Sequence, residues 1–335
     1  MSPPVNAPVS DAAIDADARP GAPLDVRIAR REDTATDTVA LELVALDGGE
    51  LPPFEAGAHV DVVVAPGLMR QYSLCNDPRE RHRYRLGVLR DPASRGGSES
   101  VHRHFAEGQV IRIGRPRCNF PLAADDRPAV LVAGGIGITP LLSMAHALHA
   151  RGTPFVLHHC ARSADRAAFA HELAASAFAP SVRSHHDDGP PAQRFALDEA
   201  LADTRGHLYV CGPDGFIEFV TQGAAARGWP AERVHVEHFK AGVSQTGTAF
   251  TVVAARSGVS VQVPEGRSVA QALIEAGVDI PLSCEQGICG TCLVPVLEGT
   301  PEHRDEYQTD EEKAANTHMT PCCSRARSAR LVLDV

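Results

Sequence analysis

The chain has 335 residues, of which 44% are hydrophobic and 22% are charged. This is too long for a single hydrophobic core, so we expect about two or three domains of a globular protein. The 32 basic and 42 acidic side chains give a net charge of −10, which argues against a nucleic-acid-binding protein. No uninterrupted apolar segment comes near the roughly 18 residues of a membrane-spanning helix, so no membrane segment is expected.

Residues 1–22 predict a disordered extension. They are rich in Ala, Pro and Asp and contain neither the basic start nor the apolar stretch of a secretion signal. The chain contains nine cysteines, an odd number without the framework of a small disulfide-bonded domain. Together these features predict a cytoplasmic protein with reduced thiols outside any metal site.

Residues 23–124 predict a β-rich domain. Apolar and polar residues alternate at 24–29, 39–44 and 84–88, and Gly, Pro and Asp separate these stretches, which is typical of a small barrel or sandwich. Residues 125–240 predict an α/β domain instead. Its expected elements are a buried strand at 129–133, a helix from Pro140 to Gly152, a strand at 155–159, a helix at 169–177 and a strand at 207–211. Such alternation favours a doubly wound, nucleotide-binding domain.

The remaining chain predicts a small third domain. Residues 241–248 are small and polar and read as a linker. Residues 250–254 and 259–263 have the alternation of a β-hairpin, and Ser268 is placed to cap a short helix at 269–276.

This third domain contains the cysteines Cys284, Cys289, Cys292, Cys322 and Cys323. Four residues separate the first two and two separate the next pair, which is the spacing of a plant-type [2Fe–2S] ferredoxin. Gly287 and Gly290 would let the backbone fold around such a cluster. A zinc site is the alternative, but zinc usually takes two C-x₂-C pairs and only one is present. The spacing leaves open whether Cys322 or Cys323 is the fourth ligand.

Three further motifs are ambiguous when each is taken alone. The turn at 134–140 suits a phosphate at a helix N-terminus, or it is only a tight turn. Cys211-Gly212-Pro213 ends a strand, where a buried core cysteine is the plainer interpretation. The polar side chains of 70–73 and 97–98 occur in many strands and loops. A chain that binds both a nicotinamide and a one-electron cluster nevertheless needs a flavin between them, and the first domain remains to hold it.

Taken together and in this order, the motifs Arg70-x-Tyr72-Ser73, 134–140, 211–213 and the cysteine series resemble the phthalate dioxygenase reductase family. This family includes vanillate O-demethylase reductases and belongs to the ferredoxin–NADP⁺ reductase superfamily. The resemblance covers about residues 24–335. It implies an antiparallel flavin-binding β-barrel at 23–124, a doubly wound NAD-binding α/β domain at 125–240 and a β-grasp [2Fe–2S] ferredoxin domain at 249–335.

The resemblance also implies cofactors and site residues. The flavin would be FMN rather than FAD, held by Arg70, Tyr72, Ser73, Leu89, Arg90, Gly97 and Ser98. The nucleotide would be NADH, held by Gly135, Gly137, Thr139, Gly212 and Pro213. Cys211 would lie beside the nicotinamide, and Glu237 and Phe239 would close over the flavin. The cluster ligands would be Cys284, Cys289, Cys292 and Cys322, with Cys323 a packed neighbour.

The implied function is the reductase component of a Rieske-type aromatic oxygenase or O-demethylase. A monomer would pass electrons from NADH through FMN and the cluster to a separate oxygenase. One alternative is a stand-alone NAD(P)H-dependent reductase of flavin, ferric complexes or other small acceptors; a redox sensor ranks last. Arg162 and Arg166 keep NADPH open as a minor alternative. The acidic stretch at 305–312 is a solvated face or, as the sharper hypothesis, a docking patch.

Overall fold

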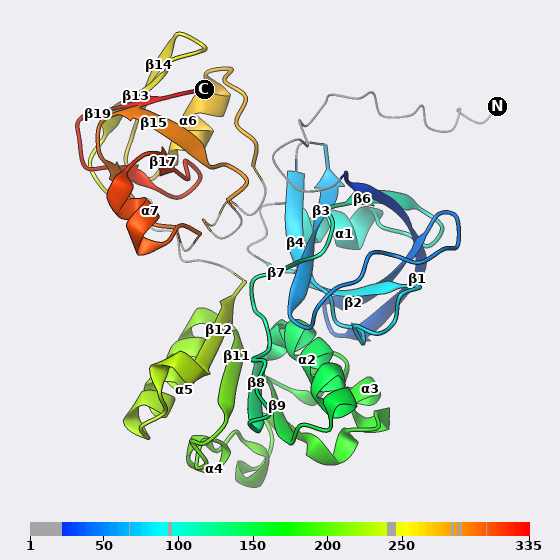
Figure 1. Cartoon of the computed structure of the whole chain (residues 1–335). Coiled ribbons are helices and arrows are strands. Elements are labelled where there is room, and N and C mark those ends of the chain that lie inside the picture. Colours follow the sequence, from blue (N-terminus) through cyan, green and yellow to red (C-terminus); the bar gives the residue numbers. More distant parts are fainter. Residues whose placement is uncertain are drawn as a thin grey trace, which may run out of the picture.

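The computed structural model describes residues 22–66, 68–92, 96–239, 246–282, 285, 287, 290–305 and 307–335. The expected extension at 1–21, most of the expected linker, Cys284 and Cys289 lie outside the described residues. Three groups of strands and helices follow one another along the chain, and each forms a separate body (Figure 1). Every helix in the described part of the chain is too short or too polar to cross a lipid bilayer.

The first body is an antiparallel β-barrel, as expected. Its strands run in the order β4-β3-β6-β1-β2-β5, with β7 paired to β3. A bridge between Leu74, which follows β4, and Leu86 of β5 joins the two ends of this order and closes the barrel. Its elements are β1 (Leu24–Ala35), β2 (Thr38–Ala45), β3 (Ala58–Ala65), β4 (Leu68–Ser73), β5 (Tyr84–Leu89), α1 (Gly97–His104), β6 (Val110–Ile113) and β7 (Arg117–Cys118).

The second body is a parallel five-stranded sheet with helices on both faces. The strand order is β10-β9-β8-β11-β12. The chain therefore adds β9 and β10 on one side of β8 and then returns to add β11 and β12 on its other side. Helix α2 shares one hydrophobic core with β8 and β9, and α5 shares another with β11. The elements are β8 (Ala129–Gly134), α2 (Ile138–Arg151), β9 (Phe155–Ala161), α3 (Ala170–Ala175), β10 (Val182–His186), α4 (Leu197–Ala200), β11 (His207–Gly212), α5 (Asp214–Ala226) and β12 (Val234–His238).

Two helix boundaries differ from the expected ones. Helix α2 begins at Ile138, so Pro140 lies within its first turn, where the missing N–H has no intrahelical acceptor to lose. Its end is as expected, because Gly152 adopts the left-handed conformation with φ 70°. Helix α3 is shorter than the expected 169–177 at both ends. Phe169 has a φ of 61° and cannot begin a right-handed helix, and Ser176 is extended and ends it.

The third body is a small mixed sheet with the order β14-β13-β19-β15-β17. The expected hairpin is confirmed in β13 and β14, and Ser268 caps α6 through a capping box with Gln271. Strands β13 and β19 run parallel at the centre, over a core that also contains residues of α6 and Cys292, Cys322 and Cys323. The elements are β13 (Phe250–Ala254), β14 (Val259–Val263), α6 (Val269–Glu275), β15 (Val294–Glu298), β16 (Pro301–Glu302), α7 (Asp310–Ala315), β17 (His318–Met319), β18 (Arg325–Ala326) and β19 (Arg330–Leu333).

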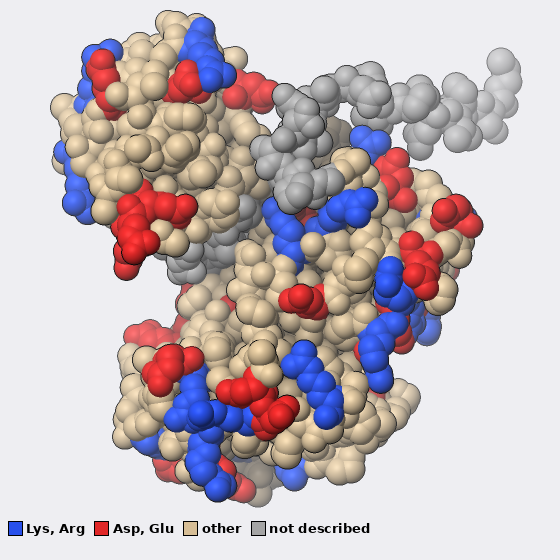
Figure 2. All heavy atoms as spheres, in the orientation of Figure 1, with Lys and Arg blue, Asp and Glu red and all other residues tan. Residues whose placement is uncertain are grey.

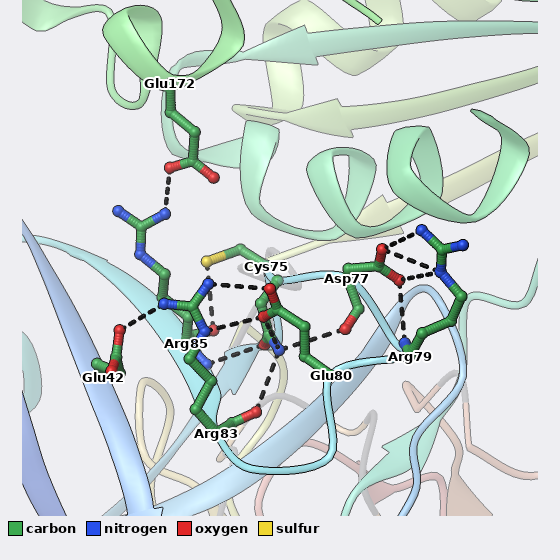
Figure 3. A network of polar contacts seen from close by, with 9 residues as sticks. Glu42, Cys75, Asp77, Arg79, Glu80, Arg83, Arg85 and Glu172 are labelled. Carbon is green, nitrogen blue, oxygen red and sulfur yellow. Dashed lines mark hydrogen bonds and ion pairs between the residues drawn. The ribbon is translucent and has the colours of Figure 1, made fainter. Parts of the chain in front are cut away.

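A charged network fastens the barrel to the parallel sheet (Figure 3). Arg85 of β5 forms ion pairs with Glu172 of α3 and Glu32 of β1, and its guanidinium lies 5.0 Å from the centre of the Phe169 ring. Gly87 lies two residues further along β5. A Cβ at this position would be only 2.7 Å from the methyl carbon of Thr139. The two bodies therefore approach each other to backbone distance at this strand.

Candidate functional site

A cavity of about 1680 Å³ lies where the barrel, the parallel sheet and the ferredoxin-like body meet. Its walls come from all three bodies, so residues more than 200 positions apart in the sequence face one space. The expected site residues that line it are Arg70, Tyr72, Ser73, Leu89, Arg90, Ser98, Gly135, Thr139, Gly212, Pro213, Glu237, Phe239 and Cys322. Gly97, Gly137, Cys211 and Cys292 are buried and do not line it.

The barrel contributes a site suited to an anion. Helix α1 starts at Gly97, and the first N–H groups of a helix have no intrahelical acceptor. The stem of Arg70 lies across this start, because a Cβ on Gly97 would be only 2.6 Å from the Cγ of Arg70. Ser98 accepts a hydrogen bond from the backbone N–H of Asp91 at 3.1 Å, which ties the helix start to the loop after β5. A phosphate fits here, between a guanidinium and free backbone donors.

The aromatic wall of this region is Tyr72 on β4. Burial raises the pKa of its hydroxyl, and the nearby Arg70 guanidinium partly offsets this shift. The phenol is therefore neutral at physiological pH, and Tyr72 contributes an aromatic side chain to the cavity lining.

The second wall is the turn between β8 and α2. Residues Gly135–Gly137 form one turn of 3₁₀-helix, with Gly135 in the left-handed region at φ 55°. Gly137 packs against the neighbouring strand β11, because a Cβ on Gly137 would lie 2.2 Å from the carbonyl oxygen of Cys211. The hydroxyl of Thr139 donates to the carbonyl of Ile136 at 3.0 Å and so holds the turn. This turn lies at the carboxyl end of the sheet where the strand order reverses, the usual position of a bound nucleotide in such folds.

Cys211 lies in the hydrophobic core behind the cavity, with no exposed surface. Glu237 pairs with it in register on β12 and does line the cavity. The buried Oε2 of Glu237 has no hydrogen-bond partner among the described residues, and burial raises the pKa of this carboxyl to about 8. Burial and the neighbouring Glu237 also raise the pKa of the Cys211 thiol. Both groups therefore hold their protons at neutral pH.

The ferredoxin-like body brings its described cysteines into one core. Cys292, Cys322 and Cys323 are all buried there, and Cys322 reaches the cavity wall. Cys323 lies within 3.1 Å of the Thr320 hydroxyl, and its sulfur fills the space beside Gly287. Among the described residues no set of three metal-binding side chains converges, and two of the four expected ligands lie outside them.

Two described glycines of the loop that contains Cys292 have a backbone conformation that suits a cluster. Gly287 and Gly290 both adopt left-handed conformations, with φ of 76° and 69°. A Cβ on Gly290 would lie 2.3 Å from the ring of Tyr307, so this ring packs directly on the Gly290 backbone. Buried thiols beside a loop with two glycines in left-handed conformations are a donor set and setting that fit a [2Fe–2S] cluster.

Two family models match the chain: the oxidoreductase NAD-binding domain at residues 131–222 and the 2Fe-2S iron-sulfur cluster binding domain at 252–327. A vanillate O-demethylase oxidoreductase from Pseudomonas sp. strain HR199 is 50% identical over 316 residues, which cover 93% of this chain and 100% of that protein. The phthalate dioxygenase reductase of Burkholderia cepacia is 41% identical over 319 residues, covering 93% and 97%.

The chain belongs to the phthalate dioxygenase reductase family. A solved structure of phthalate dioxygenase reductase, described as a modular structure for electron transfer from pyridine nucleotides to [2Fe-2S], superposes with a TM-score of 0.73 at 41% identity. The match covers 93% of this chain and 98% of that one. The expected family and the expected three-part fold are thus both confirmed. As a family member the chain is an oxidoreductase with an NAD-binding domain and a [2Fe–2S]-binding domain.

Several residues that line the cavity were not predicted from the sequence. Glu285, Leu282 and Tyr307 line the cavity from the cysteine loop and its neighbours. Phe216 of α5 lies against Gly134, where a Cβ would be 2.8 Å from its ring. Glu285 lies inside the cysteine motif and could have been noted for that reason. The others carry no local signal, because only the folded chain brings them to the cavity.

Proposed function

We propose that this protein is the reductase component of a Rieske-type oxygenase or O-demethylase system, in which electrons pass from NADH through FMN and a [2Fe–2S] cluster to a separate oxygenase. The observation that supports this proposal is the single cavity between three bodies. It brings an anion site of the barrel, a nucleotide-type turn and a cysteine of the cluster domain to one space. When bound, the flavin supplies the conversion between two-electron and one-electron transfer.

The chain's own residues mainly bind and orient. Arg70, Ser98 and the N-terminus of α1 would hold the flavin phosphate, and Tyr72, Ser73, Leu89 and Arg90 would line the ring and ribityl region. The turn at 135–139 and the segment Gly212-Pro213 would hold the nicotinamide nucleotide. Phe239 packs against the core beside the cavity and would cover the flavin from that side, next to Glu237.

The iron ligands in this proposal are Cys284, Cys289, Cys292 and Cys322. Cys322 faces the cavity, whereas the sulfur of Cys323 contacts the Thr320 hydroxyl and packs beside Gly287. The domains are taken as 23–124, 125–240 and 249–335, joined by a linker at 241–248 and preceded by the extension 1–22.

NADH is the proposed electron donor. An NADPH site needs a guanidinium for the 2′-phosphate. Arg166 lies 3.6 Å from Asp37 and is thus already paired, while Arg162 also lines the cavity, where the acidic Asp187 on the neighbouring segment would oppose a 2′-phosphate. Both features favour the unphosphorylated nucleotide.

The partner would approach the ferredoxin-like body. Figure 2 shows acidic side chains gathered over α7, which begins with Asp310, Glu311 and Glu312. Such a face suits a basic surface around the acceptor's own redox centre. We further infer a monomeric, cytoplasmic protein. The described cysteines form no disulfide with one another, which is typical of a reducing compartment.

The experiment that tests this function is a reconstituted turnover assay. The purified chain, NADH and an O-demethylase oxygenase are combined, and demethylated product is measured beside ferric and quinone reduction. The proposal expects product formation coupled to NADH oxidation. Rapid reduction of the small acceptors with no electron delivery to Rieske oxygenases would instead establish a stand-alone reductase.

A further inference from the structure

An ion pair joins the anion site of the barrel to the cysteine loop. Arg70 of β4 and Glu285 are 215 positions apart, and the Nη1 of Arg70 lies 3.1 Å from the Oε1 of Glu285. Both side chains are largely buried, with 17% and 19% of their surfaces exposed. Both also line the cavity. The pair therefore lies between the expected flavin phosphate and the expected cluster.

Glu285 has an unusual backbone conformation for a residue with a side chain. Its φ is 56°, in the left-handed region that strongly favours glycine. It directly follows Cys284 in the sequence. A glutamate held in this conformation, where glycine would cost less strain, indicates that its side chain has a role.

Arg70 is arranged to serve two anions at once. Its Nη1 donates to the Met69 carbonyl at 2.8 Å and to Glu285, which together fix the plane of the guanidinium. Within the described residues Nε and Nη2 have no hydrogen-bond partner, and Nε lies beside Gly97 at the start of α1. A guanidinium has five N–H donors in a rigid fork, so the second edge stays available to a phosphate.

We infer that Glu285 is a positioning residue: it orients Arg70 toward the flavin phosphate and thereby ties the cysteine loop to the flavin site. This inference rests on the proposed function, because it requires a phosphate-bearing flavin in the barrel and a cluster in the loop. The physical reason is preorganisation. A guanidinium already fixed by one carboxylate loses less side-chain freedom when it binds the phosphate.

The first test compares FMN with riboflavin, which lacks the phosphate. Dissociation constants are measured by flavin fluorescence on the full-length protein carrying its cluster, for wild type, Glu285→Ala, Glu285→Gln and Glu275→Ala. Glu275 is the matched control, because it forms an exposed ion pair with Arg267 in the same domain and does not line the cavity.

We expect Glu285→Ala to weaken FMN binding about fivefold, equivalent to about 1 kcal/mol, and to leave riboflavin binding unchanged. Glu285→Gln should recover part of the loss, since its amide oxygen still accepts from Arg70. Glu285→Gln also provides the comparison if Glu285→Ala fails to retain the cluster. Unchanged or tighter FMN binding in both variants would overturn the inference, as would an equal loss for FMN and riboflavin.

The second test is rapid mixing of the FMN-saturated protein with NADH. We expect Glu285→Ala to bleach the flavin at the wild-type rate and to reduce the cluster about fivefold more slowly. A cluster rate equal to those of wild type and Glu275→Ala would overturn the inference while the proposed function stands. Failure of NADH to reduce wild-type flavin would overturn the proposed function instead. The inference stands only if the phosphate-specific loss and the slower cluster reduction both occur.

Discussion

Cys211 and Glu237 lie opposite each other on the adjacent parallel strands β11 and β12, and only the carboxyl side of the pair lines the cavity. The thiol is fully buried behind it, and the carboxylate would be a buried charge without a partner among the described residues. The cavity wall therefore presents a neutral, protonated carboxyl at this point, with a neutral thiol buried behind it. This arrangement suits the binding of an uncharged nicotinamide ring better than the activation of a thiolate nucleophile.

Cys211→Ala is expected to slow flavin reduction by NADH about tenfold, because it leaves a void directly behind the surface that positions the nicotinamide. The cluster absorbance should be unchanged. Cys75→Ala is the matched control: Cys75 is equally buried, but in the barrel and away from the cavity lining. A wild-type rate of flavin bleaching in Cys211→Ala would remove this thiol from the mechanism.

Glu237 predicts a pH-dependent stability. Its folded-state pKa is raised to about 8 from the usual 4.5, so between these values the unfolded chain is ionised and the folded protein holds the proton. The folded state then binds more protons, and the free energy of unfolding falls as pH rises from about 4.5 to about 8. In wild type this decrease in the free energy of unfolding amounts to a few kcal/mol, and Glu237→Gln should abolish it.

The measurement is chemical denaturation of wild type and Glu237→Gln at pH values of about 5, 7 and 9, without nucleotide. We expect the variant's advantage to grow with pH. A difference between the two proteins that stays constant across this range would show that the carboxyl is not buried in its protonated form.

The two adjacent cysteines should behave differently. Cys322→Ser is expected to lose the cluster absorbance, because Cys322 faces the cavity and the expected cluster position. Cys323→Ser should retain it, since that sulfur already contacts the Thr320 hydroxyl and the Gly287 backbone. Iron content and visible spectra of the two variants decide the matter, and the opposite result would reassign the fourth ligand.

Gly137→Ala is expected to destabilise the NAD-binding sheet by about 1–3 kcal/mol and to weaken NADH binding. The reason is that the new methyl group would meet the Cys211 carbonyl at 2.2 Å, and backbone cannot move aside as a flexible side chain can. Gly215→Ala is the control, because nothing lies within 4 Å of its added Cβ. Calorimetry of both variants checks this, and equal stability would contradict the tight packing of the turn.

Local patterns in the sequence predicted part of this molecule well. The hairpin at 250–263 and the capped helix after Ser268 are specified by alternation and a capping residue within a few positions. The cysteine spacing and glycine turn identified the family, which the comparisons confirmed. In contrast, α1 was not predicted, because its first residues, Gly97 and Ser98, are poor helix formers and read as a turn.

The contacts that assemble the site could not be predicted. Arg70 meets Glu285 and Arg85 meets Glu172 only because separate domains dock, and neither pair leaves a pattern in the sequence. The strand pattern alone favoured a buried core cysteine at Cys211, and the family resemblance placed it beside the nicotinamide; only the folded chain shows the thiol buried behind the cavity wall. Long-range packing decides such details, whereas periodicity and spacing record only local order.

The central claim is that one cavity couples a nicotinamide, a flavin and a cluster. It is tested most directly by an anaerobic NADH titration followed by visible absorbance and low-temperature EPR, with the released flavin identified by chromatography. The account predicts FMN, bleaching of its absorbance by NADH, and a rhombic signal of the reduced [2Fe–2S] cluster. Flavin reduction without any reducible cluster would contradict it.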